Sequence, residues 1–180
     1  EIELRATVAT TDLPSNQAAY QFNLDRLTVN QTLLDAGTAI LVSNTARPFN
    51  PFFTFGNLAN TSFPTGPRTP LNLSLTNSIV NVPDPFPRVF DISLANLQAS
   101  WNGPSNIFVN NNIFQNSQDT GAGINIGTQS STDLAVIEIS QNTFQMNGNF
   151  TRGITIGTSG PSVNLIDRNL INMNGFGAFG

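Results

Sequence analysis

The chain has 180 residues, of which 39% are hydrophobic, including 14 Phe, but only 10% are charged, against about a quarter in typical soluble domains. This apolar content predicts a folded core and not a disordered chain, and the absence of cysteine means that no disulfide supports it. The net charge is −4 and the seven basic residues, all Arg, form no cluster, which argues against a nucleic-acid partner. No apolar run approaches the ~18–20 residues needed to insert across a bilayer.

Residues 1–70 are the least regular part of the chain. Short strands are expected within 19–29 and 38–42, and four evenly spaced arginines, at positions 5, 26, 47 and 68, are compatible with short coils or with coincidence. Proline density from 47 to 67 excludes a central strand, so we expect a long Pro/Phe-rich loop there. Its phenylalanines are expected to cap an open end of the fold or to contact another chain: Phe49, Phe52, Phe53, Phe55 and Phe63.

A repeat becomes visible after residue 70 and is clearest after residue 105. The segment 107–116 matches 137–147, and Gly123-Ile-Asn-Ile-Gly-Thr128 matches Gly153-Ile-Thr-Ile-Gly-Thr158, so both pieces recur at the same interval. A third copy begins at Val163, at a slightly shorter interval, and looser copies centre on Asn77 and Asn96.

Each copy alternates apolar and polar residues over a few positions, which predicts short strands with one buried face. The repeating unit is therefore strand, Asn turn, strand, loop, strand, loop. One unit cannot bury its apolar side alone, so successive units must stack, with six to eight coils about 4.8 Å apart. We predict inward, stacked positions for six isoleucines: Ile124, Ile126, Ile137, Ile139, Ile154 and Ile156.

The Asn-x-apolar turn and the Gly-Ile-x-Ile-Gly strand resemble the right-handed parallel β-helix repeats of the pectin-lyase-like superfamily, clearly over 106–180, moderately over 71–105 and weakly before. The resemblance implies an all-β, right-handed parallel β-helix, a solenoid that forms one domain over 1–180. Within that domain, 1–70 would hold irregular coils and a capping or interface loop, and 71–180 the regular coils. The final residues, 174–180, resemble the start of another strand, which suggests a piece of a longer solenoid or an end that docks onto a neighbour.

The repeated asparagines predict a structural ladder of Asn112, Asn142 and Asn169, with amides hydrogen-bonded between coils. Asn tolerates a positive φ, which would suit the turn. Replacing one ladder residue by alanine is expected to cost about 1–3 kcal/mol.

Enzymes of the resembling family use Arg or Lys beside Ca²⁺, or a group of aspartates, to cleave polysaccharides. Here the carboxylates do not recur at the repeat period: Asp84, Asp91, Asp119, Asp133, Glu138 and Asp167. Glu138 is expected to project outward with Phe108 in the equivalent position one coil earlier, and Arg168 beside Asp167 is expected to form a solvated turn pair. We assign no catalytic, cofactor or metal residue. Trp101, the single tryptophan, either contacts a glycan or covers the flank of the solenoid, which is the commoner outcome.

These observations favour a non-catalytic, extracellular or cell-surface, structural or adhesive module of a larger protein. Its partners would be surface glycans or further copies of itself, packed end to end or laterally. A polysaccharide-binding or -cleaving β-helix and a self-assembling filament or sheath subunit are the alternatives. No activity on polysaccharides is expected, because only arginine and scattered carboxylates could serve as acid or base.

Overall fold

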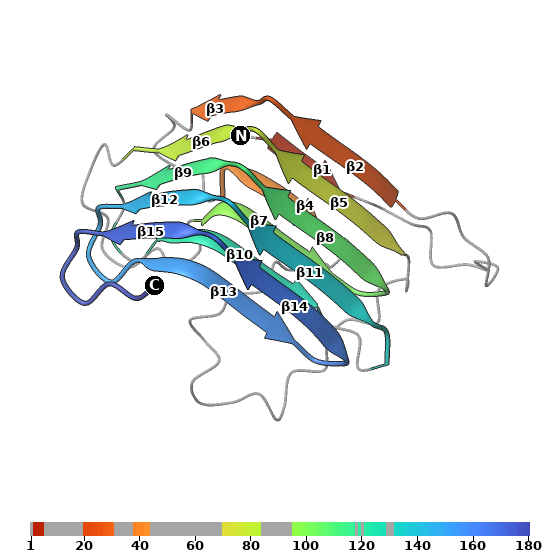
Figure 1. Cartoon of the computed structure of the whole chain (residues 1–180). Coiled ribbons are helices and arrows are strands. Elements are labelled where there is room, and N and C mark those ends of the chain that lie inside the picture. The colour runs from red at the N-terminus through yellow and green to blue at the C-terminus, as the bar shows by residue number, and fades with distance from the viewer. Residues whose placement is uncertain are drawn as a thin grey trace.

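The computed structural model describes residues 2–5, 20–30, 38–43, 70–83, 95–117, 119, 121–128 and 132–180. Within them the chain forms fifteen strands and no helix, arranged in three five-stranded sheets, A, B and C (Figure 1). Every strand pair is parallel. The all-β expectation is confirmed.

The three sheets take successive strands in turn. Sheet A contains β1 (Ile2–Arg5), β4 (Ile40–Ser43), β7 (Ala95–Trp101), β10 (Ala122–Thr128) and β13 (Arg152–Thr158). Sheet B contains β2 (Tyr20–Asp25), β5 (Leu71–Thr76), β8 (Ser105–Asn110), β11 (Ala135–Ser140) and β14 (Ser162–Asp167). Sheet C contains β3 (Thr28–Asn30), β6 (Ile79–Val82), β9 (Ile113–Asn116), β12 (Thr143–Met146) and β15 (Leu170–Met173).

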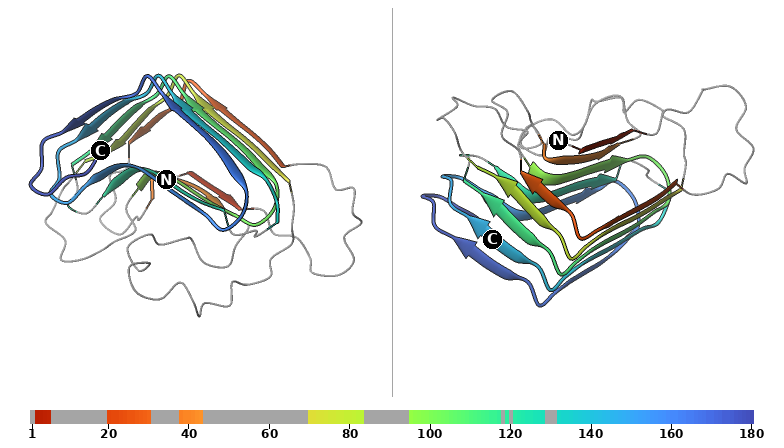
Figure 2. Two further views of the ribbon diagram at one scale, coloured as in Figure 1. Left: turned by 60° about the horizontal axis from the view of Figure 1, so that its bottom comes forward. Right: turned by 90° about the horizontal axis from the view of Figure 1, so that it is seen from above.

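The chain therefore passes from B to C to A and returns to B one level further along, and we call each such circuit a coil. The sheets surround a common interior (Figure 2), an arrangement compatible with a parallel β-helix, or solenoid. Each sheet is five strands deep, so the expected six to eight coils were too many for the described residues.

The register of the strands confirms the 30-residue repeat and the slightly shorter interval that follows it. Ala135 pairs with Ser105 on one side and with Ser162 on the other. The sequence offset between equivalent positions is 30 from Asn112 to Asn142 and 27 from Asn142 to Asn169. Towards the N-terminus it grows to 34 between β5 and β8 and to 51 between β2 and β5. The even arginine spacing is therefore not a coil length: Arg5 ends a strand of sheet A, whereas Arg26 lies in the turn after sheet B. The division of the domain at residue 70 stays a prediction.

The interior is filled by one stack of apolar side chains from all three sheets. Ile124 and Ile126 pair with Ile154 and Ile156, and Ile137 with Ile107, so the predicted inward register is confirmed. Full burial of such side chains stabilises the fold by about 1.5–3 kcal/mol each. In sheet C the rings of Phe114 and Phe144 stack with their centroids 5.1 Å apart.

One of the looser copies was assigned wrongly. Asn96 does not follow a strand of sheet B; it lies within β7, a strand of sheet A. Its buried amide bridges the corner between sheets C and A, donating to the carbonyls of Val80 (2.7 Å) and Gln115 (2.8 Å), and accepts a hydrogen bond from Asn116 (3.1 Å). A strand–Asn–apolar pattern alone does not distinguish this corner from the turn between B and C.

Candidate functional site

The turn between sheets B and C carries a column of buried amides that crosses the coils. Asn112 Nδ2 lies 3.0 Å from Asn142 Oδ1, and Asn142 Nδ2 lies 3.0 Å from Asn169 Oδ1. The same oxygens accept backbone N–H groups of the preceding coil, from Asn112 (2.9 Å) and Asn142 (3.0 Å). The structure thus brings together the three asparagines of the predicted ladder. The contribution of this ladder to the free energy of unfolding stays a prediction, which mutation tests.

The column extends one coil further than the asparagines. The backbone N–H of Ser78 donates to Asn112 Oδ1 (2.9 Å), and Ser78 Oγ accepts from the backbone N–H of Leu27 (3.0 Å). Asn77, which the sequence comparison aligned with Asn112, instead pairs with Asn111 at the surface, Asn111 Nδ2 to Asn77 Oδ1 at 2.7 Å. Sequence reasoning missed Ser78 because its hydroxyl provides the same acceptor without the amide that made the pattern visible.

The positive φ of these turns falls one residue before the column and not on it. Five residues adopt φ between 48° and 58° there: Arg26, Asn77, Asn111, Gln141 and Arg168. The expectation that the ladder asparagine itself takes this conformation was wrong. The position with positive φ holds Arg and Gln as well as Asn, so the conformational preference of one residue type does not explain the turn. The hydrogen bonds between coils impose it instead.

The outer face of sheet B shows which polar groups meet outside the core. Its outward residues form three rows along the stack. The rows are Gln21, Asn72, Asn106, Val136 and Val163; then Asn23, Ser74, Phe108, Glu138 and Leu165; then Asp25, Thr76, Asn110, Ser140 and Asp167.

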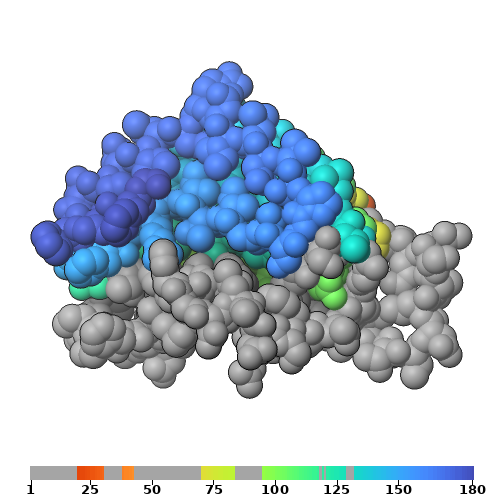
Figure 3. All heavy atoms as spheres, turned by 90° about the horizontal axis from the view of Figure 1, so that it is seen from below, coloured from red at the N-terminus to blue at the C-terminus, as the bar shows by residue number. Residues whose placement is uncertain are grey.

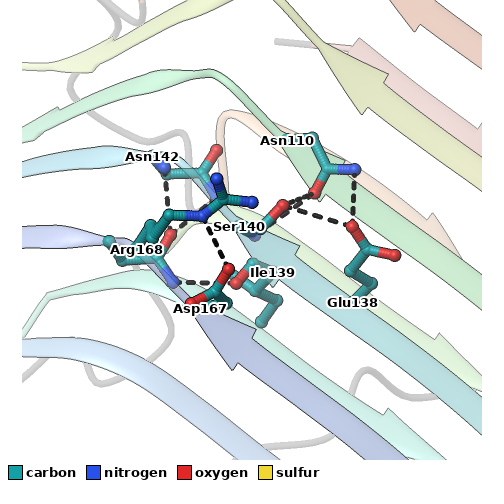
Figure 4. A network of polar contacts seen from close by, with 8 residues as sticks. Asn110, Glu138, Ile139, Ser140, Asn142, Asp167 and Arg168 are labelled. Atoms are coloured by element: carbon teal, nitrogen blue, oxygen red, sulfur yellow. Dashed lines mark hydrogen bonds and ion pairs between the residues drawn. The ribbon is translucent and has the colours of Figure 1, made fainter.

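Glu138 is held by neutral partners on this face. Asn110 Nδ2 donates to Glu138 Oε1 (3.2 Å), and the Ser140 hydroxyl, which donates to Asn110 Oδ1 (2.9 Å), lies 3.2 Å from the same Glu138 oxygen (Figure 4). Phe108 occupies the equivalent position one coil earlier, as expected, and Leu165 the position one coil later. Asn110 and Ser140 are separated by 30 residues, the same interval as the sequence repeat, so the sequence could have predicted that these two side chains meet.

Asp167 and Arg168 lie on the next strand and turn. Arg168 Nε donates to Asp167 Oδ2 at 2.7 Å, with side chains 69% and 44% exposed, which matches the expected solvated pair. Asp167 pairs in register with Ser140, two positions from Glu138, so the two carboxylates are diagonal neighbours. In a parallel sheet, a strand spacing of about 4.8 Å and a rise of about 3.3 Å per residue place the backbones of such diagonal neighbours about 8 Å apart.

Asp25 forms a similar pair at the opposite edge of the sheet. Its Oδ1 accepts hydrogen bonds from Asn77 Nδ2 (2.7 Å) and Thr76 Oγ1 (2.8 Å) on the next coil, and its Oδ2 lies 3.4 Å from Arg26 Nε. The hydrogen bonds from Asn77 and Thr76, and then the charge of Arg26, hold the pKa of Asp25 below its usual value.

The remaining sequence candidates lie elsewhere. Trp101 points into the core and is fully buried, with its ring edge-on to Tyr20 at a centroid distance of 5.9 Å, so it offers no face to a sugar in the folded chain. Asp119 Oδ1 accepts the backbone N–H of Asn149 (2.7 Å) across a coil boundary. The five phenylalanines at 49–63, with Asp84 and Asp91, lie outside the described residues.

The described ranges hold no group of three or more acidic side chains that could bind a metal ion. No helix in those same ranges is both long and apolar enough to cross a membrane. In comparisons with protein families, with curated proteins and with solved structures, nothing matches this chain.

Proposed function

We propose that this chain is a non-catalytic structural or adhesive module of an extracellular or cell-surface protein, built as a right-handed parallel β-helix. The right hand follows from general experience, because crossover connections between parallel strands of one sheet are right-handed in about 98% of cases. The low charge and the lack of cysteine suit a chain that is exported unfolded and then stacks coil upon coil.

The observation that carries the proposal is an outward row of carboxamides along sheet C. All five residues of this row are Asn or Gln: Asn30, Asn81, Gln115, Gln145 and Asn172. Gln115 Nε2 donates to Gln145 Oε1 at 2.8 Å, so part of the row is linked from coil to coil. On sheet B, Asn106 Nδ2 donates likewise to Asn72 Oδ1 (2.7 Å).

Such rows favour a repetitive contact over a catalytic centre. Side chains that bond to their equivalents on neighbouring coils are fixed at the interstrand spacing of about 4.8 Å. They present alternating donors and acceptors along an extended face, whereas a catalytic site needs groups that converge on one reacting atom. An extended partner rich in hydroxyl groups, such as a surface glycan, is the chemistry that this face suits.

Adhesion of chain-coated beads to surfaces carrying neutral and acidic polysaccharides tests the proposal. Beads should be retained, and a Gln115→Ala/Gln145→Ala variant should be retained several-fold less. The matched control is Asn72→Ala/Asn106→Ala, which removes an equivalent exposed amide pair from sheet B and should adhere like the parent. Equal retention of all three proteins would contradict adhesion through sheet C.

A second candidate, cleavage of polysaccharides, is favoured by the diagonal placement of Glu138 and Asp167 beside Arg168. Carboxyl groups about 5–10 Å apart are the arrangement that glycoside hydrolysis requires. Incubation with uronic-acid and neutral glycans, followed by assays for new reducing ends and for unsaturated products, tests it. Turnover that is lost in both Glu138→Gln and Asp167→Asn would replace the adhesive proposal by this one.

A further inference from the structure

The outer face of sheet C carries a second row of side chains beside the carboxamides. Two positions before each Asn or Gln of the carboxamide row, and therefore on the same face, each strand has an aliphatic residue or a threonine. We call this row the aliphatic strip: Thr28, Ile79, Ile113, Thr143 and Leu170. Ile79 and Ile113 are 40% and 38% exposed, although isoleucine is usually a buried residue.

The turn before sheet C adds a third row on the other side of the strip. In the three middle coils this row consists of the exposed residues Asn77, Asn111 and Gln141. Asn111 Nδ2 donates to Asn77 Oδ1 at 2.7 Å, just as Gln115 donates to Gln145 in the carboxamide row (2.8 Å). The aliphatic strip is therefore bordered by amides on both sides.

This pattern belongs to a side of the stack and not to an end. Figure 1 shows β6, β9 and β12 side by side between β3 and β15, and Figure 3 looks onto the last coil, with earlier coils behind it. The strip residues of β6, β9 and β12 therefore have a neighbouring coil on both sides. At the last coil, Phe179 pairs with Arg152, which fits the expectation that 174–180 start another strand.

The bordering amides keep hydrogen-bonding capacity for a ligand. A carboxamide has two N–H donors and an oxygen with two lone pairs. The bond between Gln115 and Gln145 uses one N–H of the first side chain and one lone pair of the second. It leaves the Gln115 side-chain oxygen and both N–H groups of Gln145 to other partners. Amides held in this way can both donate to and accept from hydroxyl groups.

The three middle coils carry no charge on this face. All their residues in the three rows are Asn, Gln, Ile or Thr. Arg26 and Arg168, at the two ends of the turn row, each lie beside an aspartate, Asp25 (3.4 Å) and Asp167 (2.7 Å). An acidic polysaccharide would gain no ion pair on the middle coils, so this face is complementary to a neutral ligand.

The size of the face favours a narrow ligand over a second copy of the chain. Its strands of four residues rise about 3.3 Å per residue and its five strands lie about 4.8 Å apart, so the face is about 13 Å wide and about 24 Å long. This area of about 300 Å² is far below the about 800 Å² that each partner contributes to a stable protein interface. The strip itself is one side chain wide, which matches a single extended chain.

We propose that sheet C binds one chain of a neutral, flat polysaccharide of the cellulose or chitin type, which lies along the aliphatic strip. The ring substituents of these sugars are equatorial, so each ring has C–H groups on its two faces and polar groups along its edges. The C–H face covers Ile79 and Ile113 and removes them from water, while the edges meet the amides on either side. The inference rests on the proposed function and adds the class of glycan and the side of the sugar that is bound.

Isothermal titration calorimetry of the full chain with cellohexaose and chitohexaose tests the proposal. At least one of them should bind, and the tighter of the two identifies the type of glycan. Maltohexaose, whose linkage coils the sugar chain, and hexagalacturonate, which is acidic, should bind at least tenfold more weakly. Equal binding of either of these two, or no binding of both flat oligosaccharides, would overturn the proposal.

Ile79→Thr/Ile113→Thr removes most of the apolar surface of the strip. Threonine keeps the β-branched shape and already occupies this row on two other coils, so the circular dichroism spectrum should not change. The variant should bind the flat oligosaccharide at least fivefold more weakly. Val136→Thr/Val163→Thr makes the same kind of change on the outer face of sheet B and should bind like the parent. Equal affinities of the two variants would exclude the strip as the binding surface.

Ile113→Trp provides an independent test through a gain of affinity. The indole enlarges the apolar surface of the strip, so binding should tighten several-fold and change the tryptophan fluorescence. Trp101 is fully buried, and the parent should therefore show no such fluorescence change. Unchanged affinity together with unchanged fluorescence would contradict the position of the sugar over Ile113.

Two outcomes separate this inference from the proposed function. If beads adhere through Gln115 and Gln145 while Ile79→Thr/Ile113→Thr adheres like the parent, adhesion stands and the inference fails. If beads adhere to no polysaccharide and no oligosaccharide binds, both fail. A dimer in sedimentation velocity that Ile79→Thr/Ile113→Thr dissociates would overturn the inference by assigning the strip to a second copy of the chain.

Discussion

Removal of one amide from the buried column tests how the coils are held together, and Asn142→Ala is the sharpest variant. Asn142 is 1% exposed. Its Nδ2 donates to the Val109 carbonyl (2.7 Å), and its Oδ1 accepts the backbone N–H of Asn112 (2.9 Å). Both backbone groups lie at the level of the preceding coil and lose this partner together.

The size of the stability loss in Asn142→Ala depends on which buried groups lose a hydrogen-bond partner. Asn112 Nδ2 keeps two other acceptors, the carbonyls of Leu75 (2.9 Å) and Asn110 (3.0 Å), and Asn169 Oδ1 keeps the backbone N–H of residue 142. The Asn112 N–H and the Val109 carbonyl lose their side-chain partner, at about 1–3 kcal/mol for each buried group left unsatisfied. The two groups together predict a loss of about 2–6 kcal/mol in the free energy of unfolding, a range that extends above the about 1–3 kcal/mol that the sequence alone suggested.

Urea unfolding followed by circular dichroism measures this loss, and two controls isolate its cause. Asn142→Ser should recover part of the stability, because Ser78 Oγ already accepts the backbone N–H of Leu27 at the equivalent position and donates to the Thr76 carbonyl (2.7 Å). Asn106→Ala removes an exposed amide contact and should cost less than about 0.5 kcal/mol. The reasoning is refuted if Asn142→Ala is as stable as Asn106→Ala, or if serine is no better than alanine.

Three further substitutions probe the core, a charge and a close backbone approach. Ile139→Asp places an unpaired charge among fully buried side chains and should abolish the folded spectrum, whereas Ile139→Val should cost only about 0.5–1.5 kcal/mol in urea unfolding. The pKa of Asp25 is lower in the folded chain than in the unfolded chain, where it is about 4. The Asp25 carboxylate therefore stabilises the fold fully above the pKa of the unfolded chain, and this stabilisation is lost as the pH falls through the pKa of the folded chain. The difference in unfolding free energy between the parent and Asp25→Asn should therefore shrink from about pH 6 to pH 3, and a constant difference would contradict this assignment. Gly175→Ala should lower the melting temperature because a Cβ there would overlap the Gly148 carbonyl oxygen, whereas Gly180→Ala, with nothing within 4 Å, should not.

The sequence predicted the fold where its repeat is short and constant. Equivalent residues are 30 positions apart both between β8 and β11 in sheet B and between β10 and β13 in sheet A. This single interval fixes the register of two sheets, and the register places the isoleucines inward. Periodicity failed where insertions lengthen the coils, since the offset between β2 and β5 is 51. The coil spacing is then no longer visible as a repeat.

The polar network shows a second limit of the sequence. The outward position of Glu138 was predictable from its two isoleucine neighbours, but its partners Asn110 and Ser140 lie on different coils. Glu138 and Asp167 become neighbours only because β11 and β14 pair with an offset of 27 and not 30. A small difference in the length of one loop decides which carboxylate lies beside which hydroxyl, and composition carries no information about it.

The unusual composition of the chain follows from this architecture. In a stack of parallel strands each outward residue has an equivalent about 4.8 Å away on both sides, so a repeated charge would face its own kind along the whole row. Two like charges at about 4 Å repel by about 1 kcal/mol in water and by about 4 kcal/mol at an effective dielectric constant of 20. An amide instead donates to one neighbour and accepts from the other.

The charged residues in the outer rows of sheet B all have neutral neighbours in their rows: Thr76 beside Asp25, Ser140 beside Asp167, and Phe108 and Leu165 beside Glu138. The stacking of equivalent rows therefore selects against charge, and the 10% charged content of the chain is a consequence of its fold.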